Sequence, residues 1–354
     1  EQQIKPIMVE PKDGQTHREA WEEYFAGLQL ADVREITILD QQIRSTIARF
    51  SNKAAAADEK GDRKAAVEWF QRSRDVIGEA LRAGHVQPWM YQAYAIALSA
   101  TGAADSEVER ALLSAVDFAE TPSDILNVAA RLEDVGSDAA ALRLCKQVAS
   151  LDANRREPYV MGLRLAERLG ETSELVWACN GVLSQAWPKE FEPVVEKARL
   201  LARSTYAELI ESGKTEEAAK FGEELKLAGA HDVVIRVSWT GEADIDLSVE
   251  EPGGTVCSLE NRSSAGGGTL LGDSYPGEGD DQSGKISETY VCPRGFNGQY
   301  RLLVRMVLGE VSTGNVTVEI MTDALRASQR FIKTEIPLTE KDAFFVFDVK
   351  EGNR

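Results

Sequence analysis

The chain has 354 residues, of which 43% are hydrophobic and 28% charged, so it has the composition of a globular protein with room for two domains. Its net charge of −18 opposes binding to nucleic acid and to anionic lipid, because both depend on clustered cations. No apolar run approaches the roughly 20 residues of a membrane span. The chain begins at Glu1 with a polar, extended segment, which suggests either a processed secreted protein or a piece of a longer chain.

The chain divides into two parts of different composition. Residues 40–229 are rich in Ala, Leu, Glu, Arg and Lys with apolar side chains at helical spacing, after an extended segment and a leading helix in residues 1–39. Residues 231–354 are rich in Val, Thr and Gly with short alternating runs, which is typical of strands. We therefore predict an α-helical domain followed by a separate β domain, joined near Gly229.

The helical part repeats every 34 residues. Gly102, Gly136 and Gly170 follow this period, and Cys145 and Cys179 occupy equivalent positions within it. Each unit reads as two helices separated by a glycine turn, with a proline near the end of the second. The clearest predicted pairs are 124–135 with 139–151 and 159–169 with 172–183. Since one hairpin cannot bury its apolar face alone, the units should stack into an α-solenoid.

This pattern resembles the tetratricopeptide repeat over roughly residues 40–229. The period, the glycine in mid-repeat and the small Ala141 early in the second helix match that family, whereas Leu175 replaces the small residue in the next unit. The resemblance implies a right-handed stack with a concave surface for a protein partner, and it implies no chemistry. Cys145 and Cys179 are expected to be core residues. Trp187 is expected to pack in a hairpin, although Trp187-Pro188 could instead edge a peptide groove.

Short strands separated by turn signals follow from residue 232. Alternation is clear in residues 300–306, where Tyr300, Leu302, Val304 and Met306 share one face. Eight strands without an intervening helix predict an antiparallel β-sandwich. The predicted strands are 232–239, 244–249, 255–259, 286–292, 299–307, 315–321, 331–336 and 343–349.

Acidic residues are concentrated in the segment 242–281, which carries ten acids, one base and eight glycines. Asp244 and Asp246 are two apart on a predicted strand, so both carboxylates should face the same side. Carboxylates on glycine-bent loops suit a hard cation such as Ca²⁺. Asp244 and Asp246, with Asp273 as a third, are therefore candidate ligands, and the alternative is a solvated acidic rim.

The same region resembles the YfaP-type domain of unknown function. The similarity rests on residues 237–254, which contain an Asp-x-Asp-Leu strand and a Pro-Gly-Gly turn, and on the glycines at 266–268 and 272. This resemblance covers about the last 120 residues. It implies a bacterial protein in which the domain follows tetratricopeptide repeats, and a periplasmic or extracellular setting. It implies no activity.

Cys257 and Cys292 depart from the usual pattern of that domain. Each is flanked by strand residues, and in a sandwich they could meet as a disulfide that closes a loop of about 35 residues and stabilises the fold by about 3–4 kcal/mol in the chain-entropy model. Two buried thiols are the alternative.

No catalytic site is predicted. The chain lacks a Gly-x-Ser-x-Gly elbow and a His-Glu-x-x-His motif, and its three histidines, His17, His85 and His231, lie far apart in the sequence. Residues 213–215 read Gly-Lys-Thr, but Glu208 stands where a phosphate-binding loop needs glycine, so no nucleotide site is expected.

The sequence therefore predicts a non-enzymatic scaffold whose helical array binds a protein and whose β domain caps the array. In that arrangement the hairpin 205–228 should pack on the sandwich through residues such as Leu209 and Phe221. Two alternatives remain open: a Ca²⁺-dependent adhesion module, and a carbohydrate-binding β domain with Tyr275, Tyr290 and Phe296 as an aromatic platform.

Overall fold

A computed structural model describes residues 5–29, 32–272, 286–338 and 341–353. The chain divides into two compact units, residues 1–151 and 152–354. The first is helical, and the second contains four α-helices followed by two β-sheets. Within the described residues, the structure contains no helix with the length and apolar character that a membrane span requires.

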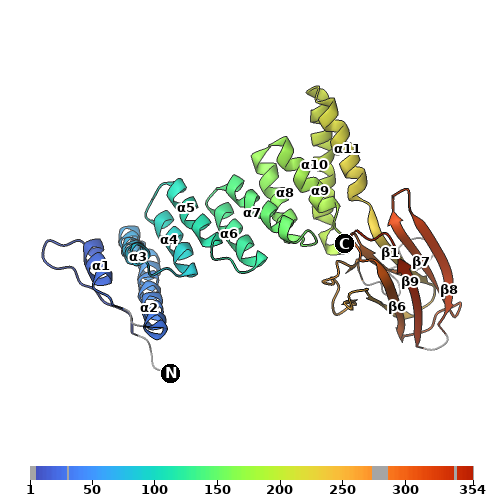
Figure 1. Cartoon of the computed structure of the whole chain (residues 1–354), viewed down its shortest axis with the longest axis horizontal. Coiled ribbons are helices and arrows are strands. Elements are labelled where there is room, and N and C mark those ends of the chain that lie inside the picture. The colour runs from blue at the N-terminus through green and yellow to red at the C-terminus, as the bar shows by residue number, and fades with distance from the viewer. Residues whose placement is uncertain (1–4, 30–31, 273–285, 339–340, 354) are drawn as a thin grey trace. The chain divides into compact units, whose positions relative to one another are not determined.

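Helical hairpins make up the first unit (Figure 1). After α1, the helices pack in consecutive antiparallel pairs, α2 with α3, α4 with α5 and α6 with α7. The predicted start of the repeats at residue 40 lies inside α2. The helices are α1 (His17–Ala26), α2 (Val33–Asp58), α3 (Arg63–Arg82), α4 (Pro88–Ala100), α5 (Asp105–Val116), α6 (Pro122–Asp134) and α7 (Asp138–Leu151).

Local chemistry at the helix ends explains the repeat. Gly102 and Gly136 have φ values of 72° and 76°, which L-residues with a side chain adopt at a cost, and each turns the chain between two paired helices. Pro88 and Pro122 stand in the first turn of α4 and α6, where a missing N–H costs nothing. Thr121 adds a capping box at the start of α6. The 34-residue spacing is thus a spacing of helix caps.

Four helices open the second unit: α8 (Glu157–Leu169), α9 (Thr172–Leu183), α10 (Glu192–Glu211) and α11 (Thr215–Ala228), with a short 3₁₀ turn at Lys189–Phe191. Gly170, at φ 67°, ends α8 in the same way. Cys179 is fully buried in α9, as Cys145 is in α7, which confirms that both are core residues. Burial raises the pKa of the Cys179 thiol to about 12, so the thiol is protonated and unreactive at neutral pH.

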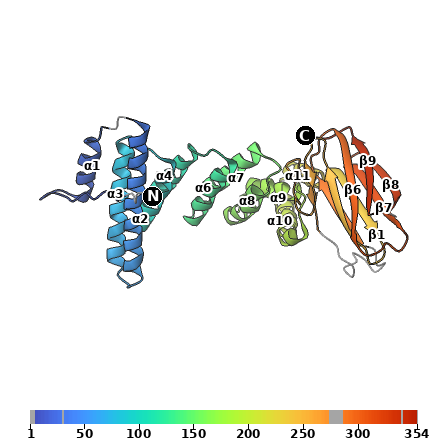
Figure 2. The same cartoon turned by 90° about the horizontal axis from the view of Figure 1, so that it is seen from below.

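The β domain is an antiparallel sandwich of a five-stranded sheet, in the order β4-β5-β1-β7-β8, and a four-stranded sheet, in the order β3-β2-β6-β9 (Figure 2). All eight predicted strands are present, and the two-residue strand β4 was not expected. The strands are β1 (His231–Trp239), β2 (Asp244–Glu250), β3 (Val256–Cys257), β4 (Thr269–Leu270), β5 (Ile286–Cys292), β6 (Gly298–Leu308), β7 (Asn315–Ala324), β8 (Arg330–Pro337) and β9 (Asp342–Val349).

Alternation along the strands fixes which side chains form the core between the sheets. Val233, Ile235 and Val237 of β1 are fully buried, as are Ile245 and Leu247 of β2. Because successive side chains point to opposite faces, a register slip of one residue would move these groups to the surface. The core of the sandwich is therefore specified strand by strand.

His231 begins β1, directly after α11, and its Nδ1 is buried with no hydrogen-bond partner among the described residues. Burial lowers the pKa of His231, and the neighbouring Arg326 lowers it further. The unfolded chain takes up a proton on this histidine near its ordinary pKa of about 6.5, whereas the folded chain takes it up only at lower pH. Stability should therefore fall as the pH falls through about 6.5.

We expect the second unit to unfold at a lower temperature at pH 5.5 than at pH 7.5, as measured by calorimetry. Replacing His231 with Asn should make this difference smaller. A variant with the wild-type pH dependence would show that burial of His231 does not contribute to it.

Candidate functional site: an arginine-lined pocket in the second unit

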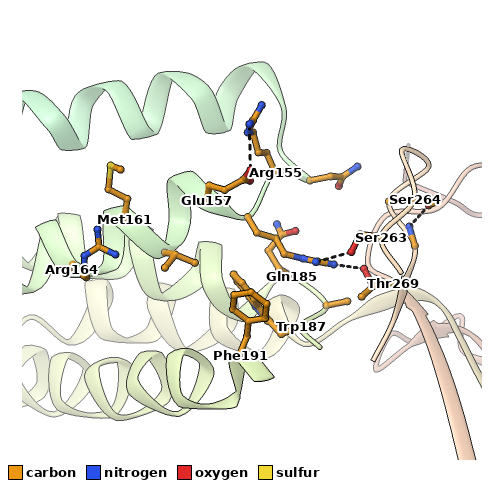
Figure 3. A pocket seen from close by; sticks show the side chains of 16 residues that line it. Arg155, Glu157, Met161, Arg164, Gln185, Trp187, Phe191, Ser263, Ser264 and Thr269 are labelled. Carbon is orange, nitrogen blue, oxygen red and sulfur yellow. Dashed lines mark hydrogen bonds and ion pairs between the residues drawn. The ribbon is translucent and has the colours of Figure 1, made fainter. Parts of the chain in front are cut away.

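A pocket of about 630 Å³ lies within the second unit, between the start of α8, the segment that joins α9 to α10, and the loop that joins β3 to β4 (Figure 3). Its lining contains three arginines, one glutamate, several apolar side chains and hydroxyl groups of the loop between β3 and β4, residues 258–268 with Thr269, which we call the β loop. The lining residues are Asn154, Arg155, Arg156, Glu157, Val160, Met161, Arg164, Gln185, Ala186, Trp187, Phe191, Ser263, Ser264, Gly267, Gly268 and Thr269.

Arg156 links the helices to the β loop across this pocket. Its Nη1 donates to Ser263 Oγ at 2.9 Å, and its Nη2 donates to Thr269 Oγ1. Its guanidinium carbon lies 5.7 Å from the centre of the Trp187 ring, within range of a cation–π interaction. Burial lowers the pKa of Arg156, because desolvation disfavours the cation. The cation is thus held by two neutral hydroxyls and an aromatic ring.

Two aromatic rings form an apolar wall. Trp187 and Phe191 have ring centroids 5.4 Å apart, and Trp187 Nε1 donates to the carbonyl oxygen of Val182 at 2.7 Å, which fixes the indole. Phe191 stays 38% exposed. Trp187 was expected in a hairpin core. It lines the pocket instead, because Pro188 and the 3₁₀ turn carry the chain around the end of α9.

Helix α8 supplies a stripe along the same pocket. Glu157, Val160, Met161 and Arg164 follow the spacing i, i+3, i+4 and i+7, so they lie on one helix face. Arg155, just before the helix, pairs with Glu157 at 3.3 Å between Nη2 and Oε1. The wall that α8 contributes is therefore apolar in the middle and charged at both ends, as the labelled side chains of Figure 3 show.

The β loop owes its shape to a buried carboxylate, Glu251, which is 2% exposed. Glu251 accepts hydrogen bonds from Thr255 Oγ1 at 2.5 Å, Ser264 Oγ at 2.5 Å, the Gly268 amide at 3.1 Å and the Tyr290 hydroxyl at 2.8 Å. A Cβ on Gly268 would lie 2.3 Å from Glu251 Oε1 and from the Tyr290 ring, so only glycine fits there. This network holds the loop that carries the hydroxyl partners of Arg156.

The predicted metal ligands lie elsewhere, on the outer face of the four-stranded sheet. Asp244 and Asp246 face the same side of β2, as expected from their spacing. Asp246 stands in register with Arg305, which also forms hydrogen bonds of 2.9 and 3.1 Å to Asp342. Asp273 lies outside the described residues. Within the described part of the chain no three His, Cys, Asp or Glu side chains are grouped as a metal site, and Ca²⁺ binding stays a prediction.

Cys257 and Cys292 are both fully buried in the sandwich core, and the structure holds both as thiols. Burial raises the pKa of Cys257 to about 11, and its Sγ donates to the Arg262 carbonyl oxygen at 3.4 Å. The disulfide between them stays a prediction for an oxidising compartment.

One further expectation is wrong in part, and another stays a prediction. Tyr290 is fully buried with its hydroxyl on Glu251, so it cannot belong to a surface platform for carbohydrate, and Tyr275 lies outside the described residues. The hairpin of α10 and α11 packs on itself and on α9. Its packing on the sandwich stays a prediction, and the end of α11, at Leu227 and Ala228, lines a hollow with Pro293 and Arg326 of the β domain. Among the described residues, Arg156 and the Lys189 amide donate hydrogen bonds to the β domain, the latter to the Leu271 carbonyl oxygen at 2.9 Å.

The sequence does not predict the pocket, because the walls of the pocket come from segments about 30 and 75 residues apart. Two features of the sequence point to this region: the pair of arginines at 155–156 before a predicted helix, and Trp187-Pro188, which could edge a groove. Neither signal shows that the glycine-rich loop returns to the same place.

No protein-family model matches the chain, and no curated protein matches it. A solved structure described as the crystal structure of MamA protein is similar over 51% of this chain and 91% of that chain, with 14% sequence identity and a TM-score of 0.29. Likeness at this level says nothing about what the chain binds. The helical half is a tetratricopeptide-like array of hairpins, and the C-terminal half is an antiparallel two-sheet β domain.

Proposed function

We propose that this protein is a non-enzymatic scaffold for protein–protein interaction, which binds a segment of its partner in the arginine-lined pocket of the second unit. The observation that carries the proposal is the composition of the pocket wall. Arginine, tryptophan, phenylalanine and methionine are enriched at protein interfaces, and Arg156, Trp187, Phe191 and Met161 converge on one concavity.

The hydroxyl groups of the pocket support a binding role over a catalytic one. Ser263 accepts a hydrogen bond from Arg156, and Ser264 donates to the buried Glu251. A nucleophilic serine needs a general base that takes its proton, and the arginine that donates to Ser263 cannot act as one. The carboxylate that Ser264 meets is buried and already accepts from Thr255, the Gly268 amide and Tyr290, so its lone pairs are used to hold the loop. These hydroxyls serve the geometry of the site.

The first unit adds a groove of about 280 Å³ between α4, α5 and α6. Ala95, Ile96, Val108 and Leu112 line it, and Ile96 is 53% exposed. An exposed isoleucine beside a hollow between helices supports a second contact for the same partner on the hairpin array.

The setting and the role of the β domain belong to the same proposal. The resemblance to the YfaP-type domain favours the periplasm or the cell exterior of a bacterium. The hydroxyls of Ser263 and Thr269 favour a β domain that both caps the array and completes the binding pocket.

A selection from random phage-displayed peptides on the full chain tests the proposal. Selected peptides should bind Phe191→Ala at least tenfold more weakly than the wild type, because Phe191 is an exposed ring of the pocket. Phe331→Ala is the matched control, since Phe331 is 55% exposed on β8 and does not line the pocket. Peptides that bind both variants equally, or a selection that yields none, would refute the pocket as the interaction site.

A further inference from the structure

We infer that the pocket recognises an acidic peptide segment with one large aromatic side chain, whose carboxylates meet Arg156 and Arg164 and whose ring packs on Trp187 and Phe191. This inference rests on the proposed function and names the chemistry of the partner. Three observations carry it: the charge of the lining, the hydrogen-bond partners of Arg156 and the presence of both polar and apolar groups in the pocket wall.

The lining has the opposite charge to the protein as a whole. It contains three arginines against one glutamate, in a chain whose net charge is −18. Guanidinium groups bind carboxylates through paired, charge-assisted hydrogen bonds. A short acidic segment would find complementary charge here, whereas a long polyanion such as nucleic acid would be repelled by the rest of the chain.

Arg156 is the lining residue that we expect to bind an anion. Its guanidinium is partly removed from water, its hydrogen bonds go to the neutral oxygens of Ser263 and Thr269, and the nearby carboxylates of Glu157 and Glu190 offset its charge only in part, since burial still lowers its pKa. A cation taken out of water is costly unless an anion compensates it. The bonds to Ser263 and Thr269 also fix the guanidinium in one position, so a ligand carboxylate would meet a pre-organised donor.

The apolar side chains in the pocket wall indicate that the ligand has an apolar part as well as a charged part. Val160, Met161, Trp187 and Phe191 line the pocket together with Arg156, whose guanidinium lies 5.7 Å from the Trp187 ring, and Ser263 and Thr269 line it from the loop between β3 and β4 (Figure 3). The volume of about 630 Å³ lies within the range of roughly 300–1,000 Å³ typical of ligand pockets. A small inorganic anion would leave the aromatic wall exposed to water, so an acidic segment with an aromatic side chain fits both kinds of group.

The first test compares two fluorescein-labelled heptapeptides on the full chain by fluorescence anisotropy. One reads Ser-Glu-Glu-Phe-Glu-Glu-Ser, and the other has glutamine in place of every glutamate. We expect the acidic peptide to bind at least tenfold more tightly, and its affinity to fall as salt is raised from about 50 to about 200 mM. Equal affinities, or displacement of the acidic peptide by inorganic phosphate at its own concentration, would overturn the inference.

The second test uses single substitutions. Arg156→Gln and Arg164→Gln should each weaken the acidic peptide about tenfold and leave the glutamine peptide unchanged. Arg164 is exposed on α8, so its variant keeps the test valid even where loss of Arg156 disturbs the β loop. Arg199→Gln is the matched control, because Arg199 pairs with Glu192 and Glu196 on α10 and does not line the pocket.

The outcomes separate this inference from the proposed function. If Phe191→Ala weakens both peptides while the arginine variants weaken neither, the pocket binds segments without reading their charge, and only the inference fails. If all these variants bind the acidic peptide like the wild type, it binds elsewhere, and the inference fails together with the assigned site.

Discussion

Replacing Glu251 with alanine is expected to destabilise the β domain by about 3–5 kcal/mol, because the variant leaves several buried donors without an acceptor. The Tyr290 hydroxyl, the Ser264 hydroxyl and the Gly268 amide all donate to this one carboxylate. A buried donor without a partner costs about 1–3 kcal/mol. The Gly268 amide keeps Ser264 Oγ as an acceptor at 3.1 Å, but the loss at the Tyr290 and Ser264 hydroxyls is still large beside a typical total stability of about 5–15 kcal/mol.

Urea denaturation would measure the free energy of unfolding of each variant. Hydrogen exchange would then measure the protection of the amides in the strands of the sandwich. Glu250→Ala is the matched control at the neighbouring position, since Glu250 ends β2, is 44% exposed and pairs with Arg301 at 3.6 Å. That exposed pair should contribute less than about 1 kcal/mol. Similar effects of the two substitutions would show that the Glu251 network does not hold the loop.

A second consequence of the Glu251 variant concerns the pocket. The loop that Glu251 anchors carries Ser263 and Thr269, the hydroxyl partners of Arg156. Loosening this loop should weaken peptide binding even where the variant remains folded. The network therefore connects the core of the sandwich to the binding surface.

The regular elements could be predicted from the sequence because their signals are local. Gly136 and Gly170 end α6 and α8 through positive φ values, and Pro122 and Pro158 stand in the first turns of the same two helices. Such positions depend on the residue and its immediate neighbours, so predicted and observed helix ends agree closely. The alternation of apolar and polar side chains is also a local signal, and it predicts eight of the strands. The two residues of β4 are too few to show such a period.

The roles of individual acids could not be predicted, because they depend on partners distant in the sequence. Glu251 belongs to the acidic segment 242–281, which by composition reads as a metal site or a solvated rim. The structure buries Glu251 among donors from three other elements and leaves Asp246 beside Arg305. Composition gives the number of charges and says nothing about which of them meet a donor.

Asp232 is the other buried acid with a large expected effect. It is fully buried at the start of β1, and it ties the end of the chain to the sandwich. Its carboxylate accepts from the Gly295 amide at 2.8 Å, from the Asn353 amide and Nδ2 at 2.7 Å each, and from Arg326 Nη1 at 2.5 Å. A buried carboxylate with four donors, one of them an arginine, stabilises the fold strongly.

Asp232→Ala should therefore cost about 3–4 kcal/mol and release the residues around Asn353, because the amides of Gly295 and Asn353 lose their acceptor and the half-buried Arg326 cation keeps only Asp323. Carboxypeptidase digestion should remove the C-terminal residues of the variant faster than those of the wild type, and calorimetry should show a lower Tm for the second unit. Asp348→Ala, on the exposed side of β9, is the matched control and should change neither. The double variant Asp232→Ala/Arg326→Ala should lose less stability than the sum of the losses of the two single variants, since both substitutions break the same ion pair. Additive losses would show that Asp232 and Arg326 are not coupled, and unchanged digestion would show that Asp232 does not hold the residues around Asn353.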